Sequence, residues 1–370
     1  MTDSFSFEVR ATCGHARLGR LRTPHGEVDT PAFMPVGTHG AVRAMSPTAL
    51  RQTGARILLS NTLHLYLRPG LEVVDALGGL HQLMGWQGPI LTDSGGFQLM
   101  SLASLLRIDD DGAFLASPHD GSRHRLTPAL AMEIQRRLGV DIAMVLDHCP
   151  PADASPEFKR EAMDRSSRWA ARCLEQDRAP GQAVFGIVQG GTDLSLRREH
   201  LETIAGLGPD GLALGGLAVG EGPEEMDRVV GAIAPEMPAD KPRYLMGVGY
   251  PRDLVVSARA GIDLFDCVVP TRHARNGQLF TSKGRLNIAN ARHRLDPAPI
   301  EEGCDCEACT LHGRAYLRHL YMTREILYSV LATAHNLTFY QRLMGRIREA
   351  IQKDDAEGLE ALERSAEAMV

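Results

Sequence analysis

The chain has 370 residues, of which 44% are hydrophobic and 23% charged, and its formal net charge is −6. These values are ordinary for a globular protein, and the length suits two domains or one large α/β barrel. An acidic chain is not expected to coat nucleic acid over its whole surface, although a local basic patch is compatible with it. The first residues lack a signal sequence, and no run approaches the roughly 18 apolar residues of a membrane span, so we expect a soluble cytoplasmic protein with no membrane partner.

Residues 1–30 read as short strands separated by turn residues. Eight short apolar runs then recur along the chain, each ending in a polar or glycine-rich turn. They cover residues 31–37, 55–61, 89–95, 141–147, 183–189, 211–216, 243–249 and 261–267. Because these runs are apolar without alternation, they are typical of parallel strands that are covered on both faces.

Helical periodicity appears between the runs, most clearly over residues 127–139, 155–176 and 222–234. Eight strand–helix units in about 250 residues predict an α/β fold of the TIM (β/α)8 barrel type. A doubly wound sheet is the alternative, but no G-x-G-x-x-G follows the first strand. We expect an N-terminal β-hairpin or sheet, the barrel, a basic segment with a zinc-binding subdomain, and a C-terminal helix, over residues 1–30, 31–270, 271–345 and 346–370.

Three aspartates, Asp93, Asp147 and Asp266, stand at predicted strand ends. A barrel places its active site at the C-terminal ends of its strands, so these carboxylates should converge. Converging carboxylates shift each other's pKa, which favours a functional site over polar residues that merely end strands. Taken singly, Asp93 is also compatible with a helix or turn cap, and Asp266 with a structural salt bridge to a nearby arginine.

The pair Asp93 and Asp266 has the chemistry that breaks glycosidic bonds, in which one carboxylate is nucleophile or stabiliser and the other is acid and base. Asp266 lies in an apolar run, as expected for an acid held rigidly at a strand end. Asp93 opens a D-S-G-G turn, where small residues let a ligand approach the backbone.

Other strand ends offer groups that match the edge of a purine base. Asp147 and Gln189 supply a carboxylate and an amide, and the stretch GGLAVGEG (215–222) supplies backbone N–H groups and Glu221. Phe97 and Met246 are candidates to stack on the ring, although either residue alone is equally typical of a core.

The stretch GCDCEAC places Cys304, Cys306 and Cys309 within six residues. Seven cysteines with this spacing do not form a disulfide framework, and they favour reduced thiols and a metal site. A closed tetrahedral site needs a fourth ligand, for which we prefer His335 over His319, while His312 is too close to the thiolates. Three thiolates and one imidazole leave no open position, so we expect one structural zinc ion.

The densest basic stretch is residues 271–295, with six lysines or arginines and no acid. Arg272, Arg275, Lys283 and Arg285 are its candidate RNA contacts. A solvated loop is the alternative. The basic stretches RRLG (136–139) and RREH (197–200) read as ordinary helix surfaces.

Taken together, these motifs resemble the bacterial tRNA-guanine transglycosylase family, the base-exchange enzymes of queuosine biosynthesis. The resemblance spans nearly the whole chain and includes HGEVDTPAFMPVGT, LSNTLHLYLRPG, LTDSGGFQ, GIVQGG, LALGGLAVGE, YLMGVG, DLFDCVVPTRHARNGQLFT and the cysteine cluster with its downstream histidine. It implies a homodimeric TIM-barrel enzyme with one zinc ion. The implied reaction replaces guanine at the wobble position, in the anticodon loop of tRNAs for Asp, Asn, His and Tyr, with 7-aminomethyl-7-deazaguanine.

The resemblance also implies a role for individual residues. Asp266 would be the nucleophile that forms a covalent aspartyl-ribose intermediate, and Asp93 the general acid/base. The other implied contacts lie around the base: Asp147, Gln189, Gly216 and Gly247 with it, Leu217 near its 7-substituent, Glu221 orienting that peptide, and Phe97 and Met246 stacked on it. Zinc would be held by Cys304, Cys306, Cys309 and His335.

Three positions bear on the subtype. Cys149 and Val219 are similar to the bacterial residues that favour the aminomethyl precursor over queuine, whereas His148 stands where the bacterial pattern usually has Glu. A glycoside hydrolase is an alternative function, but aromatic residues are only 5% of the chain, which is few for a sugar-stacking cleft. A non-catalytic RNA-binding subunit is disfavoured because both aspartates are present, and a metal-dependent hydrolase because no H-x-H follows the first strand.

Overall fold

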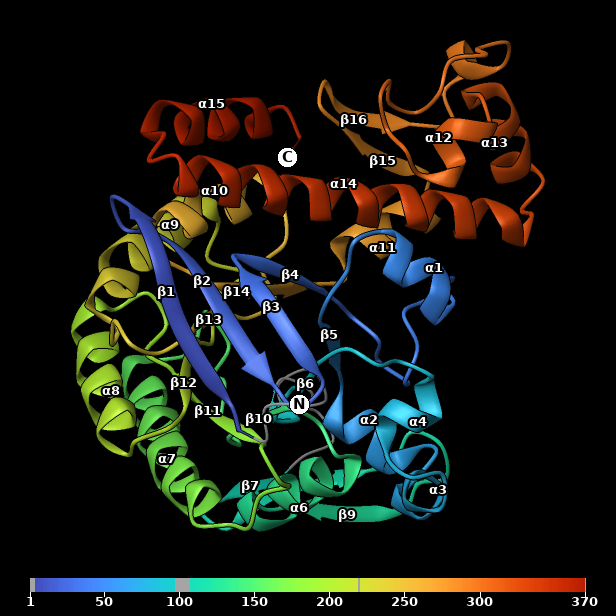
Figure 1. Ribbon diagram of the computed structural model, residues 1–370. Coiled ribbons are helices and arrows are strands. Elements are labelled where there is room, and N and C mark those ends of the chain that lie inside the picture. Colours follow the sequence, from blue (N-terminus) through green and yellow to red (C-terminus); the bar gives the residue numbers. More distant parts are fainter. Residues whose placement is uncertain (1–3, 97–106, 219, 370) are drawn as a thin grey trace.

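The computed structural model describes residues 4–96, 107–218 and 220–369, and its centre is a barrel of eight parallel strands (Figure 1). The strands are β4 (Ala32–Pro35), β5 (Leu58–Ser60), β6 (Ile90–Thr92), β10 (Ile142–Met144), β11 (Ala183–Val188), β12 (Gly211–Leu214), β13 (Arg243–Leu245) and β14 (Leu264–Cys267). They pair in the order β4-β14-β13-β12-β11-β10-β6-β5. A parallel bridge between Val36 and Leu59 connects β4 to β5, the two ends of this order, and closes the ring.

Each of the eight apolar runs contains one of these strands, so the predicted barrel is confirmed. The predicted helices are confirmed as α6 (Pro128–Leu138), α7 (Pro156–Leu174) and α9 (Pro223–Ile233). Their starts follow from the sequence, since the side chains of Thr127 and Ser155 accept N–H groups of the first turns of α6 and α7 and proline follows each. The outer ring is completed by α1 (Pro47–Gln52), α2 (Thr62–Leu67), α3 (Leu71–Ala76), α4 (Leu80–Met84), α8 (Leu194–Gly206), the 3-10 helix η2 (Ala234–Glu236) and α10 (Pro251–Arg259).

The expected N-terminal sheet consists of β1 (Ser6–Cys13), β2 (Ala16–Thr23) and β3 (Gly26–Thr30), paired antiparallel. It lies at the N-terminal end of the barrel. Arg17 bonds to Asp263, which precedes β14, and His25 bonds to Asp141, which precedes β10. The opposite end, where the strands finish, is therefore left for the site.

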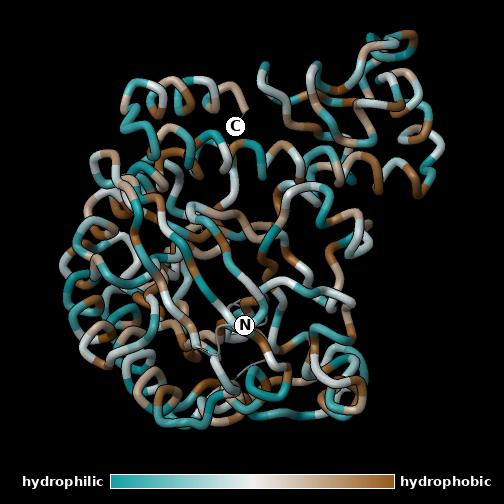
Figure 2. The backbone as a smooth tube through the Cα atoms, in the orientation of Figure 1, coloured by the Kyte–Doolittle hydropathy of each residue, from teal (hydrophilic) through white to brown (hydrophobic). Residues whose placement is uncertain are grey.

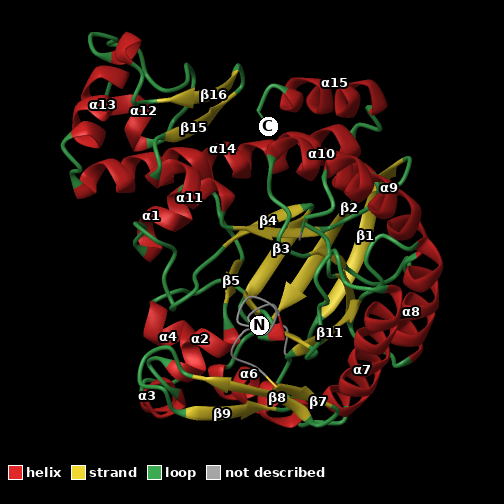
Figure 3. Cartoon of the chain, turned by 180° about the vertical axis from the view of Figure 1, so that it is seen from behind, coloured by secondary structure: helices red, strands yellow, loops and turns green. Residues whose placement is uncertain are grey.

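A second antiparallel sheet, which the sequence patterns did not predict, follows β6. It comprises β7 (Arg107–Asp109), β8 (Gly112–Ala116) and β9 (Arg123–Leu126). Both β7 and β9 carry charged, exposed side chains, so they lack the apolar run that marks the barrel strands. Seen from behind, this sheet lies at the side of the barrel away from the two C-terminal helices (Figure 3).

The C-terminal part begins with α11 (Val269–Arg275) and ends with two helices, α14 (Ile326–Gln352) and α15 (Ala356–Glu367). Between α11 and α14 the chain forms the hairpin β15 (Gln278–Thr281) and β16 (Gly284–Asn287), the 3-10 helix η3 (Ala291–His293), and the helices α12 (Glu307–Leu311) and α13 (Arg314–Met322). Helices α13 and α14 are joined by a short turn, in which Arg324 has a φ of 59°. The division of the chain at residues 30, 270 and 345 stays a prediction, and α14 continues across residue 345.

Helix α14 crosses from the barrel to the hairpin and the cysteine-rich loop (Figure 1). Its Tyr340 hydroxyl donates to the Gly249 carbonyl at 2.5 Å, and its Asn336 amide donates to the Pro270 carbonyl at 3.0 Å. In Figure 2 the outer helices alternate between hydrophilic and hydrophobic segments, as expected for helices with one buried face. Within the described ranges, no helix combines the length and the apolar composition that crossing a bilayer requires.

Candidate active site and metal cluster

A cavity of about 410 Å³ opens at the C-terminal ends of the barrel strands. It brings together eight of the predicted site residues: Asp93, Asp147, Gly216, Leu217, Met246, Gly247, Asp266 and Arg272. Other lining residues include Asn61, His64, Cys149, Tyr244 and Cys267. The three aspartates predicted from the strand ends therefore share one cavity.

Asp266 is buried near the end of β14. One of its carboxylate oxygens, Oδ1, accepts the Tyr244 hydroxyl at 2.5 Å and the Gly247 N–H at 2.8 Å. Burial raises the pKa of Asp266 to about 6, although these two hydrogen bonds oppose the rise. Within the described residues its hydrogen-bond donors are thus neutral groups, not the arginines that follow it in sequence.

Tyr244 is a site residue that the sequence analysis missed. It lies in β13, its side chain is fully buried, and in the sequence it looks like any apolar strand residue. Its hydroxyl points into the cavity and bonds to Asp266. A tyrosine within one predicted barrel strand, when the next strand carries the expected catalytic acid, was the available signal.

Asp93 has the capping role that was the structural alternative for it, and it also faces the cavity. Its carboxylate accepts the Thr62 N–H at the start of α2 at 2.8 Å and the Asn61 amide at 2.6 Å. The Thr62 hydroxyl donates to the Asp93 carbonyl. These contacts fix the carboxylate at the end of β6, so the cap positions a group that lines the cavity.

Asp147 and Gln189 contact one another as the purine-edge prediction requires. Asp147 accepts the Ser94 hydroxyl at 2.8 Å and the Gln189 amide N–H at 2.7 Å. Burial raises the pKa of Asp147. The Gln189 Oε1 atom is buried without a protein hydrogen-bond partner in the described structure. The described protein groups therefore leave the hydrogen-bonding capacity of this carbonyl oxygen unused.

The loop after β12 presents its backbone to the same cavity. Gly216 has a φ of 63°, and a Cβ there would collide with the Gln189 carbonyl oxygen, so glycine is required. The Ala218 N–H donates to the Glu221 carboxylate. Because a trans peptide points its N–H and C=O in opposite directions, this bond turns the Leu217 carbonyl away from Glu221. Phe97 and Val219 lie outside the described residues.

The interpretation of RREH as an ordinary helix surface is wrong for Arg197 and His200, whereas Arg198 and Glu199 are exposed. Arg197 and His200, which lie on α8, are fully buried. The Gln189 N–H donates to His200 Nδ1 at 2.7 Å, and burial lowers the pKa of His200 to about 4. The error arose because a buried arginine and histidine three residues apart have the same letters as an exposed polar face.

His148, the departure from the bacterial pattern, is also buried. Its Nδ1 lies 3.1 Å from an Arg165 guanidinium nitrogen, so Nδ1 is the acceptor. Burial and this cation lower the pKa of His148 to about 4, which keeps the ring neutral at neutral pH. Its side chain therefore adds no charge beside Asp147.

The four predicted RNA-contacting residues lie on two elements that follow Asp266 in the chain, α11 and the β15–β16 hairpin. Arg272 on α11 is exposed and lines the cavity, whereas Arg275 is half-buried on the same helix. Lys283 and Arg285 are exposed on the β15–β16 hairpin. Arg285 lines a second, open cavity of about 530 Å³ together with Gln278, Asn287, Asn290, Arg292 and Ala368.

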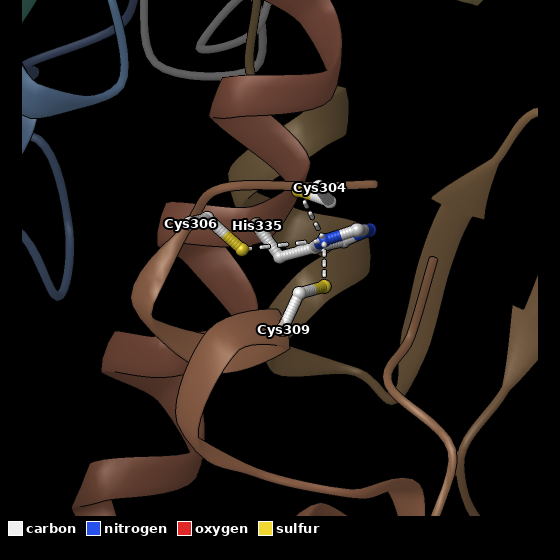
Figure 4. Close-up of side chains that lie close together, drawn as sticks. All are labelled: Cys304, Cys306, Cys309 and His335. Atoms are coloured by element: carbon white, nitrogen blue, oxygen red, sulfur yellow. Dashed lines mark hydrogen bonds between the residues drawn. The ribbon is translucent and has the colours of Figure 1, made fainter. Parts of the chain in front are cut away.

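The four predicted metal ligands converge (Figure 4). His335 Nδ1 lies 3.8, 3.6 and 3.3 Å from the sulfurs of Cys304, Cys306 and Cys309. Zn–S and Zn–N bonds of about 2.3 and 2.0 Å in a tetrahedron place sulfur and nitrogen about 3.5 Å apart, so the spacing fits zinc. His335 Nε2 lies 2.8 Å from the Phe280 carbonyl, which fixes its proton there and frees Nδ1 for a metal.

Three further potential ligands, His25, His81 and Asp141, lie together at the other end of the barrel. The two imidazole rings are stacked, with centroids 3.6 Å apart and planes 14° from parallel. A metal ion lies near the plane of each imidazole that binds it, and two stacked planes cannot share one ion. Asp141 instead accepts hydrogen bonds from both histidines, and its distance to His25 Nδ1 is 2.8 Å.

Comparison with known proteins shows the family of the chain. Residues 12–366 match the family model described as queuine tRNA-ribosyltransferase. The chain is 55% identical to the queuine tRNA-ribosyltransferase of Syntrophobacter fumaroxidans, over 92% of this chain and 91% of that protein. It is 53% identical to the protein of the same name from Azotobacter vinelandii, over 94% of each. The chain therefore belongs to the queuine tRNA-ribosyltransferase family.

Proposed function

We propose that this protein exchanges the wobble guanine of tRNAs for Asp, Asn, His and Tyr for 7-aminomethyl-7-deazaguanine in queuosine biosynthesis. The observation that carries the proposal is the cavity that holds Asp93, Asp147 and Asp266 together at the strand ends. Two of these acids suit cleavage of a glycosidic bond, and the third suits recognition of a base.

In the first half-reaction an Asp266 carboxylate oxygen attacks C1′ of the ribose. The bond from C1′ to guanine N9 breaks, and its electron pair leaves with the base, which receives a proton from the Asp93 side. Tyr244 and Gly247 hold Oδ1 of Asp266, which supports Oδ2 as the attacking atom. The RNA stays attached to the protein as an aspartyl ester.

In the second half-reaction the incoming base loses its N9 proton to Asp93 and attacks C1′. The ester bond breaks and Asp266 leaves as a carboxylate, so one base replaces another and no water is consumed. Water must be excluded while the ester exists, which suits a cavity that is closed below by the barrel core.

Base recognition falls to the opposite wall. The Asp147 carboxylate suits the N1–H and 2-amino donors of guanine, and the Gln189 amide and the Gly216 N–H suit the base edge. The Leu217 carbonyl, oriented through Glu221, suits the aminomethyl group. Met246 and Gly247 line the cavity where the base would stack. Cys149, which also lines the cavity, supports the aminomethyl base as the substrate.

The anticodon loop would bind at the rim. Arg272 marks the mouth of the cavity, and Arg285 with Arg292 supplies a second cationic surface with amide donors around it. Such a surface suits phosphate oxygens of the nucleotides beside the exchanged one. Arg275 and Lys283 are the further contacts that we propose.

Zinc is the metal that the three cysteines and His335 fit, and its role would be to hold the cysteine-rich loop to α14. Metal analysis of freshly prepared protein should give one zinc ion per chain. Removal by a chelator should lower the melting temperature, because the bonds from Arg342 on α14 to the Gly303 carbonyl and to Asp305 are exposed and weaker than metal coordination. A value well under one zinc per chain contradicts the assignment.

A homodimer is supported by exposed apolar side chains on three consecutive helices, α12, α13 and the start of α14. They are Leu311, Tyr316, Met322, Ile326 and Leu327, and Ile326 is 81% exposed. Apolar side chains gathered on one surface are typical of a protein interface, and a second copy of the chain is the occupant that we propose.

The decisive experiment incubates the protein with radiolabelled guanine and bulk tRNA. We expect label to enter tRNA, and unlabelled 7-aminomethyl-7-deazaguanine to displace it. The Asp266→Ala variant should lose both exchange and the covalent adduct with RNA. An active Asp266→Ala protein removes Asp266 as the nucleophile, and sugar release without tRNA exchange favours the glycoside hydrolase alternative.

A further inference from the structure

Arg197, in the first turn of α8, is an arginine with no exposed surface. Its guanidinium donates three hydrogen bonds, all to backbone carbonyls. They go from Nε to Gly191 at 2.8 Å, from one terminal nitrogen to Val188 at 2.8 Å, and from the other to Gly216 at 3.4 Å. Burial lowers the pKa of Arg197 to about 10, so the side chain stays charged at neutral pH.

Two of these carbonyls flank Gln189, a proposed base-reading residue. Val188 precedes it and Gly191 follows two residues later. The α8 helix also holds the backbone of Gln189 itself, because its N–H donates to His200. A Cβ on Gly190 would lie 2.9 Å from the backbone nitrogen of Arg197, so α8 packs directly against this turn. The position of Gln189 is thus set by α8.

The third carbonyl belongs to Gly216, on the neighbouring loop after β12. Because the Gly216 carbonyl points towards Arg197, the Leu217 N–H of the same peptide points away from it. This peptide joins the two proposed recognition groups of the loop, the Gly216 N–H and the Leu217 carbonyl. The next peptide is held in turn by the bond from Ala218 N–H to Glu221. Arg197 also lies within electrostatic reach of the Glu221 carboxylate. One side chain therefore ties together two loops that β11 and β12 would otherwise carry separately.

Burying a guanidinium against neutral carbonyls is unfavourable for stability compared with an apolar side chain. The planar fork of arginine is suited to binding several carbonyls at fixed angles, which lysine cannot do. The geometry of these contacts favours a role in the distance between two sets of recognition groups. A site that reads a base by hydrogen bonds depends on such distances to about half an ångström.

We infer that Arg197 is a positioning residue for base recognition. It fixes the Gln189 side chain relative to the backbone of Gly216 and Leu217, which carries the Gly216 N–H and the Leu217 carbonyl. This inference rests on the proposed function. It concerns the affinity and selectivity for the free base, whereas the RNA-binding rim and Asp266 lie on other elements. Loss of Arg197 should therefore affect the base and the RNA unequally.

The test compares Arg197→Met and Arg197→Lys in the exchange assay, with the KM for the base, the KM for tRNA and kcat measured separately. Arg197→Met should raise the KM for 7-aminomethyl-7-deazaguanine about tenfold or more and reduce its preference over guanine. The KM for tRNA should change less than about twofold. Arg197→Lys, which keeps the charge and can reach one carbonyl, should lie between the two proteins.

Arg243 provides a matched control at the other end of the barrel. It is also buried, its pKa is also lowered to about 10 by burial, and it donates to the Met237 carbonyl at 2.5 Å. Arg243→Met should lower the melting temperature without changing the KM for the base. If Arg197→Met does not fold, the KM values of Arg197→Lys decide.

Two outcomes overturn the inference. One is an unchanged KM for the base in a folded Arg197 variant, and the other is an equal change in the KM for base and for tRNA. Failure of the proposed function looks different, because the wild-type protein itself would then show no exchange.

Discussion

Both ends of the barrel bury aspartates, and the aspartates at the two ends have different partners. At the N-terminal end, Asp263 receives two hydrogen bonds from the Arg17 guanidinium, and Asp141 lies against two histidines. At the C-terminal end, the hydrogen bonds to Asp266 and Asp147 in the described structure come from hydroxyl, amide and backbone groups. The same residue type is thus paired with cationic groups at one end and with neutral donors at the other.

The difference is visible in the pKa values of Asp141 and Asp266, although burial also raises the pKa of Asp263 against the opposing effect of Arg17. Burial by itself would raise the pKa of Asp141, but hydrogen bonds from His25, His81 and the Ile90 N–H outweigh it and hold the pKa well below its usual range. Burial prevails for Asp266, whose pKa rises to about 6. A carboxylate bonded to neutral donors would keep its negative charge available to a substrate. Burying that charge lowers the free energy of unfolding.

The largest effect is expected from exchanging one acid at each end for its amide. Asp266→Asn should reduce base exchange by about 1,000-fold or more, because the amide cannot attack the ribose. The same variant should melt at the same or a higher temperature at pH 7, since it removes a buried charge. Exchange rates and calorimetric melting of the purified variant give both values.

Asp263→Asn is the matched variant at the N-terminal end, and the opposite pattern is expected. It leaves Arg17 buried without a carboxylate, which should lower the free energy of unfolding by about 3–5 kcal/mol. Exchange per folded molecule should be close to wild type. The comparison fails if both variants lose stability alike, or if Asp263→Asn loses exchange as strongly as Asp266→Asn.

A smaller effect is expected from Tyr244→Phe. As the proposed nucleophile, Asp266 would have to be ionised to attack, so kcat/KM of the wild-type protein should rise with pH through about 6. Removing the Tyr244 hydroxyl deletes a hydrogen bond that lowers this pKa, so the rise should move to higher pH. Activity at pH 6 should fall roughly tenfold and recover by pH 8.5, as measured from rates across this range. An acid limb at the same pH in both proteins contradicts the role given to Tyr244.

The smallest effect is expected at the N-terminal end from His25→Gln. The hydrogen bond to Asp141 raises the pKa of His25, so protonated His25 stabilises the folded protein at pH values below about 6.5. That contribution is lost as the pH rises through the higher folded pKa. The melting temperature of the variant should therefore lie further below wild type at pH 5.5 than at pH 8.5. A difference that is equal at both values shows that the charge of His25 is not involved.

The barrel and the positions of the acids followed from the sequence because parallel strands are apolar along their whole length and end in turns. Asp93, Asp147 and Asp266 were found from those ends alone. The β7–β9 sheet was missed because its outer strands are charged and exposed. Tyr244 and Arg197 were missed for a common reason: burial and hydrogen bonding give them their roles, and neither can be seen in the identity of one residue.

Helix α14 has a consequence for how the proposed RNA substrate fits the protein. His335 lies in the metal cluster, Asn336 bonds to the backbone at Pro270 beside α11, and Tyr340 bonds to Gly249 near the loop that holds Asp266. Because one rigid helix makes all three connections, the hairpin arginines and the carboxylate keep a constant separation. The protein would then hold these groups at a fixed distance, and the proposed anticodon-loop substrate would have to unstack its bases to reach both.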